Sequence, residues 1–132
     1  MAVPGLGGVH HIAIICSNYE VSKHFYTEVL GGKVIAETLR EARSSYKLDV
    51  AFDGFEVELF SFPNPPSRPS KPEAQGLRHL AFKVSILDEA IDYLVSNNIL
   101  VEPVRVDELT GNRFTFFQDP DGLPLELVEC KP

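Results

Sequence analysis

Hydrophobic and polar residues alternate with a period of two along most of the chain, which indicates strands with one apolar and one polar face. Each half of the chain contains four predicted strands, one at its start and three toward its end. The predicted strands are 9–16, 33–39, 45–52 and 55–62 in the first half, and 77–84, 101–106, 113–117 and 123–129 in the second.

After the first strand of each half, the hydrophobic residues recur with a helical period instead. A Ser-x-x-acid sequence precedes both helical segments, at Ser17 to Glu20 and at Ser85 to Asp88, and is typical of a side-chain cap at a helix start. The predicted buried stripes are Val21, Phe25, Tyr26, Val29 and Leu30 in the first helix, and Ala90, Ile91, Leu94 and Val95 in the second. The order β-α-β-β-β is therefore expected twice.

The two halves also share identical residues at a constant offset. Asp53 to Phe60 is similar to Asp121 to Val128, 68 positions later, and the same offset aligns the two first strands without a gap. The identical residues are Gly8, His11, Ala13, Ser17, Asp53, Gly54, Glu58 and Leu59 in the first half, with Gly76, His79, Ala81, Ser85, Asp121, Gly122, Glu126 and Leu127 in the second. Such a repeat indicates one structural unit that is used twice.

The predicted fold is α+β, with two tandem βαβββ modules that form a curved mixed sheet around a cleft. Module 1 covers about residues 8–62, and module 2 covers about residues 77–130. The segment between them, 63–76, holds five of the ten prolines and is predicted to be a stiff, extended linker, because proline cannot donate to a sheet ladder. A proline-rich recognition motif is the alternative interpretation.

One His and one Glu recur in this repeat, and 47 residues separate them in each module: His11 from Glu58, and His79 from Glu126. In each strand the His or Glu lies opposite the apolar face, which is expected to pack on the helix of the module. Two modules paired about a pseudo-twofold axis would therefore direct all four side chains into one cleft. Apolar side chains expected to line it are Ile15, Phe60, Phe62, Ala81 and Val128.

Two carboxylates in one cleft repel each other unless a cation neutralises them. Two imidazole nitrogens and two carboxylate oxygens suit a divalent ion such as Ni²⁺, Co²⁺, Mn²⁺, Fe²⁺ or Zn²⁺, and an octahedral ion would keep two positions open for water or substrate. The alternative interpretation is structural, since a single His or Glu on a strand is usually not a ligand and gene duplication alone would preserve the spacing. His10, His24, Glu56 and Glu129 have no counterpart in the repeat and are set aside.

Composition and charge narrow the class of partner. A chain of 132 residues with 44% hydrophobic residues can bury a core, and its net charge of −7 without a basic cluster argues against nucleic acid. No apolar run is long enough to span a membrane, and the first eight residues lack a basic region followed by an apolar core, so a cytoplasmic protein with a small-molecule substrate is expected. Cys16 and Cys130 have no metal-type spacing and are interpreted as apolar strand residues.

At these residues the sequence resembles the vicinal oxygen chelate superfamily, which includes glyoxalase I, bleomycin-resistance proteins, extradiol dioxygenases, fosfomycin-modifying thiol transferases and methylmalonyl-CoA epimerase. The resemblance covers almost the whole chain, as a single glyoxalase-like domain. The motifs that carry it are H-H-I-A-I from His10, F-Y-T-E-V-L-G from Phe25, V-E-L-F around Glu58, R-H-L-A-F around His79, and F-F-Q-D-P-D-G-L-P-L-E-L-V-E from Phe116.

The resemblance implies a divalent metal held by His11, Glu58, His79 and Glu126, in a glyoxalase I-like lyase or isomerase that moves a proton between adjacent carbons of a vicinal-oxygen substrate. Glu126 is then the expected base and Glu58 its partner on the opposite face, although the symmetry of the repeat leaves this choice open. A related epimerase, a thiol transferase and a non-catalytic ligand-binding protein are the alternatives. Homodimers are common in the family, and the modules could pair within one chain or across a dimer.

Two positions depart from the glyoxalase I pattern. Enzymes of that kind often hold glutathione with an Arg where this chain has Ile15 and an Asn where it has Phe62. Glutathione as a co-substrate is therefore in question, and another thiol adduct or a small oxygenated metabolite would suit the chain as well. An anion contact could come from Arg40, Arg43, Lys83, Arg105 or Arg113, each of which could equally be a solvated strand charge.

Overall fold

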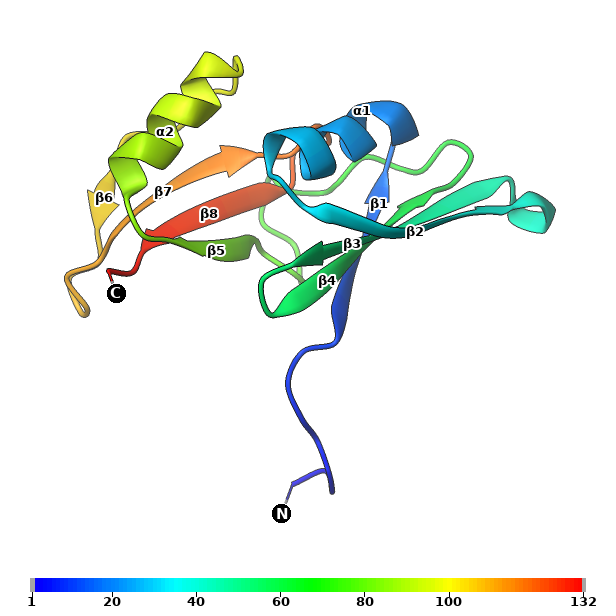
Figure 1. Cartoon of the computed structure of the whole chain (residues 1–132), viewed down its shortest axis with the longest axis horizontal. Helices are drawn as coiled ribbons and strands as arrows, with labels where there is room; N and C mark the ends of the chain where they lie inside the picture. Colours follow the sequence, from blue (N-terminus) through cyan, green and yellow to red (C-terminus); the bar gives the residue numbers. More distant parts are fainter. Residues whose placement is uncertain (1, 132) are drawn as a thin grey trace. The chain divides into compact units, whose positions relative to one another are not determined.

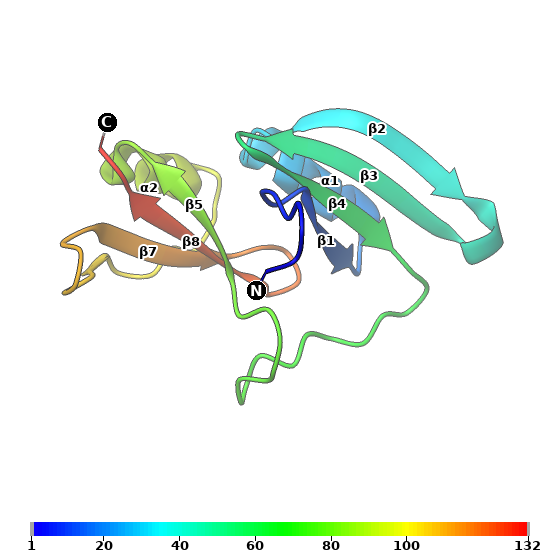
Figure 2. The same ribbon diagram turned by 90° about the horizontal axis from the view of Figure 1, so that it is seen from below.

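The computed structural model describes residues 2–131, and the chain divides into two compact units between Pro65 and Pro66. We refer to them as the N-terminal unit and the C-terminal unit. Each unit holds one four-stranded mixed sheet with a helix on one face (Figures 1 and 2). The predicted α+β fold of two βαβββ modules is confirmed.

The N-terminal unit follows the predicted order. Its elements are β1 (His11–Cys16), α1 (Tyr19–His24), the π-helical segment η1 (Phe25–Val29), β2 (Lys33–Arg40), the 3-10 turn η2 (Glu41–Arg43), β3 (Ser45–Phe52) and β4 (Phe55–Ser61). The strands lie in the order β1-β4-β3-β2, and β1 is parallel to β4 while the other neighbours are antiparallel.

The C-terminal unit repeats this arrangement. Its elements are β5 (Leu80–Val84), α2 (Leu87–Ser96), β6 (Arg105–Val106), β7 (Arg113–Gln118) and β8 (Pro124–Glu129), and the strand order is β5-β8-β7-β6. Strands β5 and β8 are parallel, with Ala81 opposite Glu126, as Ala13 is opposite Glu58 in the first unit. The repeat seen in the sequence is therefore a repeat of strand register as well.

One face of each sheet is buried, as the alternation predicts. Val57 and Leu59 of β4 are fully buried, as is Leu125 of β8, and Leu127 is nearly so. Burial of such side chains stabilises the fold by about 1.5–3 kcal/mol each. The residues between them in sequence, including Glu58 and Glu126, consequently project from the other face of their sheet.

Gly54 and Gly122 close the hairpins that lead into β4 and β8. Their φ angles are 84° and 85°, which L side chains rarely adopt, so the duplicated Asp-Gly sequences have the structural role expected of them.

Both helix starts differ from the predicted capping boxes. The cap of α1 is Asn18, whose Oδ1 accepts a hydrogen bond from the amide of Val21 at 3.2 Å. At α2 the cap position is Ile86, and the carboxylate of Glu129 accepts a hydrogen bond from the amide of Leu87 at 2.9 Å instead. A residue distant in sequence therefore replaces the local cap, which no local pattern could reveal.

The buried stripe of the first helix also differs from the prediction. Tyr19, Ser22, Phe25 and Tyr26 are buried, whereas Val21 is half exposed. The amide of Leu30 bonds to the carbonyl of Phe25, five residues back, and this π-helical turn changes the phase of the helix. In the second helix Leu87 and Leu94 are buried and Val95 is exposed.

Two strands are shorter than predicted by three or more residues. The strand predicted at 101–106 is reduced to the two residues of β6, because Pro103 lacks the amide that a ladder needs. Only Glu102 of the preceding residues joins β7, through its amide to the carbonyl of Phe116 at 2.9 Å. Strand β5 begins at Leu80, so His79 lies just before it.

The second half of the proline-rich segment belongs to the C-terminal unit. Arg68 donates hydrogen bonds to the carbonyls of Leu77 and Arg78, at 2.8 and 3.0 Å, and to the hydroxyl of Ser70 at 2.8 Å. These bonds fold the segment back toward β5, so it does more than connect two modules.

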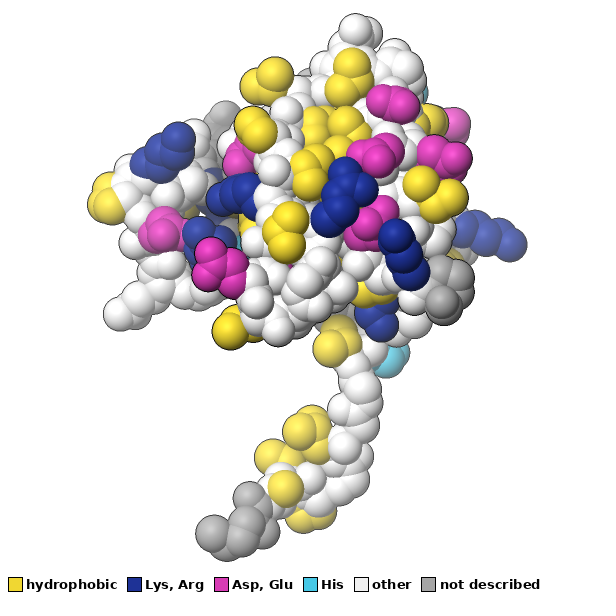
Figure 3. All heavy atoms as spheres, turned by 90° about the vertical axis from the view of Figure 1, so that its left-hand side faces the viewer, with side chains coloured by type: hydrophobic (Ala, Val, Ile, Leu, Met, Phe, Trp, Pro, Cys, Tyr) yellow, Lys and Arg dark blue, Asp and Glu magenta, His cyan; other side chains and the backbone are white. Residues whose placement is uncertain are grey.

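No helix within residues 2–131 is long and apolar enough to cross a membrane. On the face of the molecule that Figure 3 shows, Lys and Arg side chains lie among Asp, Glu and hydrophobic side chains. Charges of opposite sign are thus interspersed on this face.

Candidate metal centre

The N-terminal unit brings His11 and Glu58 together. His11 begins β1 and Glu58 lies in the middle of β4, the parallel neighbour of β1. Nε2 of His11 is 3.5 Å from Oε2 of Glu58, and their side chains are 38% and 14% exposed. The imidazole is thus open to solvent on one side, while the carboxylate is mostly covered.

Two further groups contact this pair. Nδ1 of His11 lies 2.8 Å from Nδ1 of His10, so a proton on one ring can be accepted by the other. Nζ of Lys47, on β3, is 3.8 Å from Oε2 of Glu58 and 3.4 Å from Asp49. Glu58 therefore has a cationic neighbour within its own unit.

The C-terminal unit brings His79 and Glu126 together in the same way. Nε2 of His79 is 3.2 Å from Oε1 of Glu126, and the side chains are 27% and 16% exposed. The ring of Phe116 meets the imidazole edge to face, with 5.1 Å between the ring centroids. A guanidinium nitrogen of Arg78 lies 3.2 Å from Nδ1 of His79.

The donor atoms of both pairs fit a metal ion. An imidazole nitrogen and a carboxylate oxygen each bind a transition metal at about 2.0–2.2 Å, so two such ligands at a right angle lie roughly 3 Å apart. The observed separations of 3.5 and 3.2 Å are close to this value. No group of three or more His, Cys, Asp or Glu side chains within residues 2–131 is arranged to hold a metal. Each unit thus presents one pair, and the meeting of all four residues stays a prediction.

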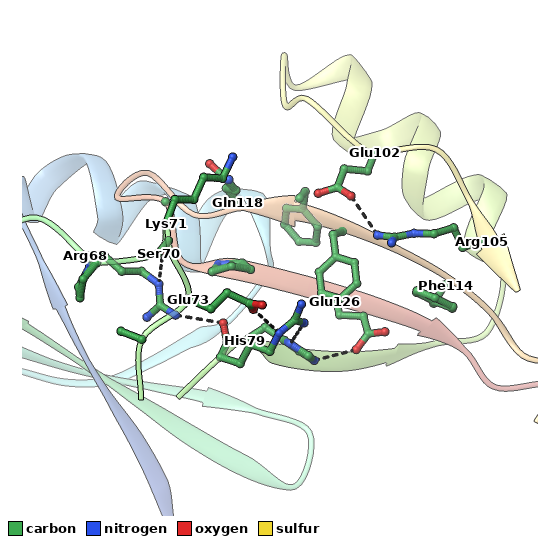
Figure 4. Close-up of a pocket in the computed structure, with 17 residues that line it drawn as sticks. Arg68, Ser70, Lys71, Glu73, His79, Glu102, Arg105, Phe114, Gln118 and Glu126 are labelled. Atoms are coloured by element: carbon green, nitrogen blue, oxygen red, sulfur yellow. Dashed lines mark hydrogen bonds and ion pairs between the residues drawn. The ribbon is translucent and has the colours of Figure 1, made fainter. Parts of the chain in front are cut away.

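The second pair lies at a cavity within the C-terminal unit (Figure 4). The cavity has a volume of about 640 Å³ and is lined by His79, Glu126, Phe114, Phe116, part of the 68–74 segment and Arg105. Ala81 and Val128 do not line this cavity, and the apolar lining predicted for a cleft between the modules stays a prediction.

Phe114 and Phe116 were not predicted as site residues, although a signal for them exists. On β7 Thr115 and Phe117 are buried, so the two Phe residues between and before them point to the open face. Phe116 is opposite Glu126 in the register of β7 and β8. The alternation of strand side chains, applied to residues 113–118, would have placed Phe114 and Phe116 on the same face of the sheet as Glu126.

Residues 8–127 match the Glyoxalase/Bleomycin resistance protein/Dioxygenase superfamily. The chain belongs to this superfamily. It is 61% identical to the uncharacterized protein YwkD of Bacillus subtilis (strain 168), over 94% of this chain and 98% of that protein. It is also similar to the crystal structure of the glyoxalase family protein from Enterococcus faecalis, with 51% identity, a TM-score of 0.87, and coverage of 92% of this chain and 97% of that one.

Two more distant relatives in the superfamily have named activities. A 2-epi-5-epi-valiolone epimerase of Actinomyces sp is 28% identical, over 96% of this chain and 81% of that protein. A protein named Glyoxylase I 4 of Arabidopsis thaliana is 27% identical, over 95% of this chain and 72% of that protein. The superfamily thus includes enzymes among the relatives of this chain.

The two positions that depart from the glyoxalase I pattern are apolar in the structure as well. Ile15 is 55% exposed on the open face of β1. The ring of Phe62 stacks on Phe60, and the guanidinium of Arg40 lies over both rings, at 4.8 Å from Phe60 and 5.6 Å from Phe62. A cation at this position is therefore supplied by Arg40 at the end of β2, while residues 15 and 62 themselves are apolar.

Proposed function

We propose that this superfamily member is a metal-dependent lyase or isomerase of the glyoxalase I type, which moves a proton between adjacent carbons of a vicinal-oxygen substrate. The observation that carries the proposal is the duplication of a His–Glu pair with nearly the same geometry in both units. Duplication of sequence alone would not require the His nitrogen and the Glu oxygen to lie at a spacing that suits a metal.

His11, Glu58, His79 and Glu126 would hold the ion, which we expect to be Ni²⁺, Co²⁺, Mn²⁺, Fe²⁺ or Zn²⁺. A bound divalent ion supplies Lewis-acid stabilisation of negative charge on the substrate oxygens. The two pairs would combine within one chain or across a homodimer, and a homodimer is the arrangement that we propose.

Glu126 is the proposed base. It borders the cavity, and Phe116 and His79 lie beside it. From this position its carboxylate would take a proton from one substrate carbon and return it to the neighbouring carbon. Glu58 has Nζ of Lys47 as a second partner at 3.8 Å and does not line this cavity, which supports a role in binding the ion. This asymmetry supports a choice that the repeat in the sequence left open.

Glutathione is not expected to be held as in glyoxalase I, because Ile15 and Phe62 offer no polar group to it. Turnover of the adduct of methylglyoxal and glutathione should therefore be weak or absent even when metal is bound. A proton-transfer epimerase is the second candidate, since it needs the same base and metal and a distant relative bears that name.

Metal analysis after reconstitution tests the proposal. The purified protein should retain a stoichiometric divalent ion after dialysis, and the double variant Glu58→Ala, Glu126→Ala should lose it. The double variant Glu41→Ala, Glu108→Ala is a matched control, because it removes two exposed carboxylates elsewhere on the surface. Absence of a retained ion, or equal retention by the first double variant, would contradict both the lyase and the epimerase proposals.

A further inference from the structure

A cation stacked on two phenylalanine rings lies at the wall of the C-terminal cavity. The guanidinium carbon of Arg105 is 5.4 Å from the ring centroid of Phe114 and 5.4 Å from that of Phe116, and all three residues line the cavity (Figure 4). The ring of Phe116 is itself 5.1 Å from the imidazole of His79. The ring of Phe116 therefore lies between the guanidinium of Arg105 and the imidazole of His79 in a chain of contacts, and it is within reach of both.

Strand pairing explains this arrangement. Arg105 is opposite Phe114 in the register of β6 and β7, and Phe116 is opposite Glu126 in the register of β7 and β8. Residues two apart on a strand share a face, so the Phe rings form a continuous apolar floor between the guanidinium and the His79–Glu126 pair. Stacking on an aromatic floor orients a guanidinium and leaves its edge free to donate.

The hydrogen-bonding capacity of Arg105 is mostly unused. A guanidinium has five N–H donors, and Nη2 of Arg105 contacts Glu102 at 3.0 Å. Within residues 2–131 this is the one hydrogen bond of the guanidinium, and both side chains are more than half exposed. An exposed pair of this kind contributes little free energy, so an incoming anion can compete with Glu102.

Two other arginines that the sequence offered as anion contacts, Arg113 and Arg40, differ from Arg105. Arg113 makes two contacts with Asp88, at 2.7 and 3.3 Å, and does not line the cavity. Arg40 stacks on two Phe rings in the N-terminal unit, but it too lies outside the wall of this cavity.

The cavity also carries more positive charge than the protein as a whole. Four cationic side chains line it against three carboxylates, although the net charge of the chain is −7. The cations are Arg68, Lys71, Arg78 and Arg105, and the carboxylates are Glu73, Glu102 and Glu126. A cavity with more cationic than anionic side chains favours an anionic ligand, even though the protein as a whole is negatively charged.

We infer that Arg105 binds an anionic group of the substrate, a carboxylate or a phosphate monoester, at the part of the cavity wall that lies across β7 from Glu126. Phe114 and Phe116 pack against the part of the substrate between this group and the vicinal oxygens. The inference rests on the proposed function for the position of the vicinal oxygens, while the anion contact itself does not require a metal.

Two pairs of probes test this inference by calorimetric titration. Malate and lactate share a 2-hydroxy acid group, and only malate has a distal carboxylate. Glycerol 3-phosphate and glycerol share a diol, and only the first has a phosphate. Each probe is titrated into metal-loaded and metal-free protein, for the wild type and for Arg105→Gln, Arg105→Lys and Arg113→Gln, and thermal unfolding checks that each variant folds.

The wild type should bind malate roughly tenfold more tightly than lactate, or glycerol 3-phosphate roughly tenfold more tightly than glycerol, since a charge-assisted hydrogen bond is worth at least this factor. Arg105→Gln should abolish the preference, Arg105→Lys should keep part of it, and Arg113→Gln should keep all of it. The pair that shows the preference identifies the anion as a carboxylate or a phosphate.

Equal binding of the two probes in both pairs, no binding of malate or of glycerol 3-phosphate, or a preference that survives in Arg105→Gln would overturn the inference. A preference that depends on Arg105 in a protein that binds no metal would uphold it and contradict the proposed function. The two proposals can therefore fail separately.

Discussion

The His–Glu pairs of the two units have nearly the same geometry, but their surroundings differ. His11 and Glu58 have a second imidazole and a lysine beside them, whereas His79 and Glu126 have an arginine, a phenylalanine ring and a cavity. The pairs fit one function, ligation of a metal, while the surroundings fit different functions. This combination supports the proposed function, in which both pairs bind one ion and the C-terminal cavity binds the substrate.

The largest expected effect comes from the two carboxylates. If Glu126 is the base, Glu126→Gln should reduce proton transfer by a factor of about 10²–10⁴, and Glu58→Gln should reduce it less after both are loaded with excess metal. Deuterium incorporation into dihydroxyacetone from D₂O, followed by NMR, measures this with or without knowledge of the natural substrate. A larger loss in Glu58→Gln would reverse the assignment of the two units.

The helix starts extend the comparison to stability. Glu129 caps α2 from a distant strand and is buried, whereas Asn18 caps α1 locally and its hydrogen bond is exposed. Glu129→Ala should therefore lower the free energy of unfolding by about 1.5–3 kcal/mol, against about 1 kcal/mol for Asn18→Ala. Urea denaturation of both variants measures the difference. Equal losses of unfolding free energy in the two variants would show that the buried cap from Glu129 stabilises the protein no more than the exposed local cap.

The neighbours of the two imidazoles predict a difference in metal affinity. A His that binds metal through Nε2 carries its proton on Nδ1, which His10 can accept from His11 but which Arg78 cannot accept from His79. Arg78→Gln should therefore raise metal affinity by up to about tenfold, which is the smallest effect typical of residues that contact a metal-binding His. His10→Phe should lower it. Competition with a chromogenic chelator measures both, and a fall in affinity in Arg78→Gln would contradict this view of His79.

The smallest expected effects are on acid stability. A hydrogen bond from Lys23 and another from Tyr19 lower the pKa of Glu37 in the N-terminal unit, and a hydrogen bond from Arg113 lowers the pKa of Asp88 in the C-terminal unit. A lowered folded-state pKa gives stability that is present above the unfolded pKa and is lost as the pH falls through the folded value.

Glu37→Gln and Asp88→Asn should each flatten the loss of stability in acid, and urea titrations at several acidic pH values measure it. Both carboxylates are exposed, so the change should be small. The pKa of Tyr19 is raised by burial and by its hydrogen bond to Glu37, which adds a loss of stability at alkaline pH that Tyr19→Phe should remove.

The sequence predicted the fold and the composition of each pair because both depend on short periods and on a repeat. Alternation placed Glu58 and Glu126 on the open face of their strands, and the constant offset matched each to its His. Contacts between residues that are distant in the sequence could not be predicted in this way. Neither the cap that Glu129 provides nor the position of Arg105 over two Phe rings follows from a local pattern, since each depends on how strands pair.

Metal stoichiometry in half-site variants tests the central claim most directly. The wild type should bind one divalent ion per chain, and the double variants His11→Ala, Glu58→Ala and His79→Ala, Glu126→Ala should each lose it entirely, because both pairs hold the same ion in the proposed centre. Retention of a tightly bound ion by either double variant, or two ions per chain in the wild type, would contradict the claim that the two pairs form one centre.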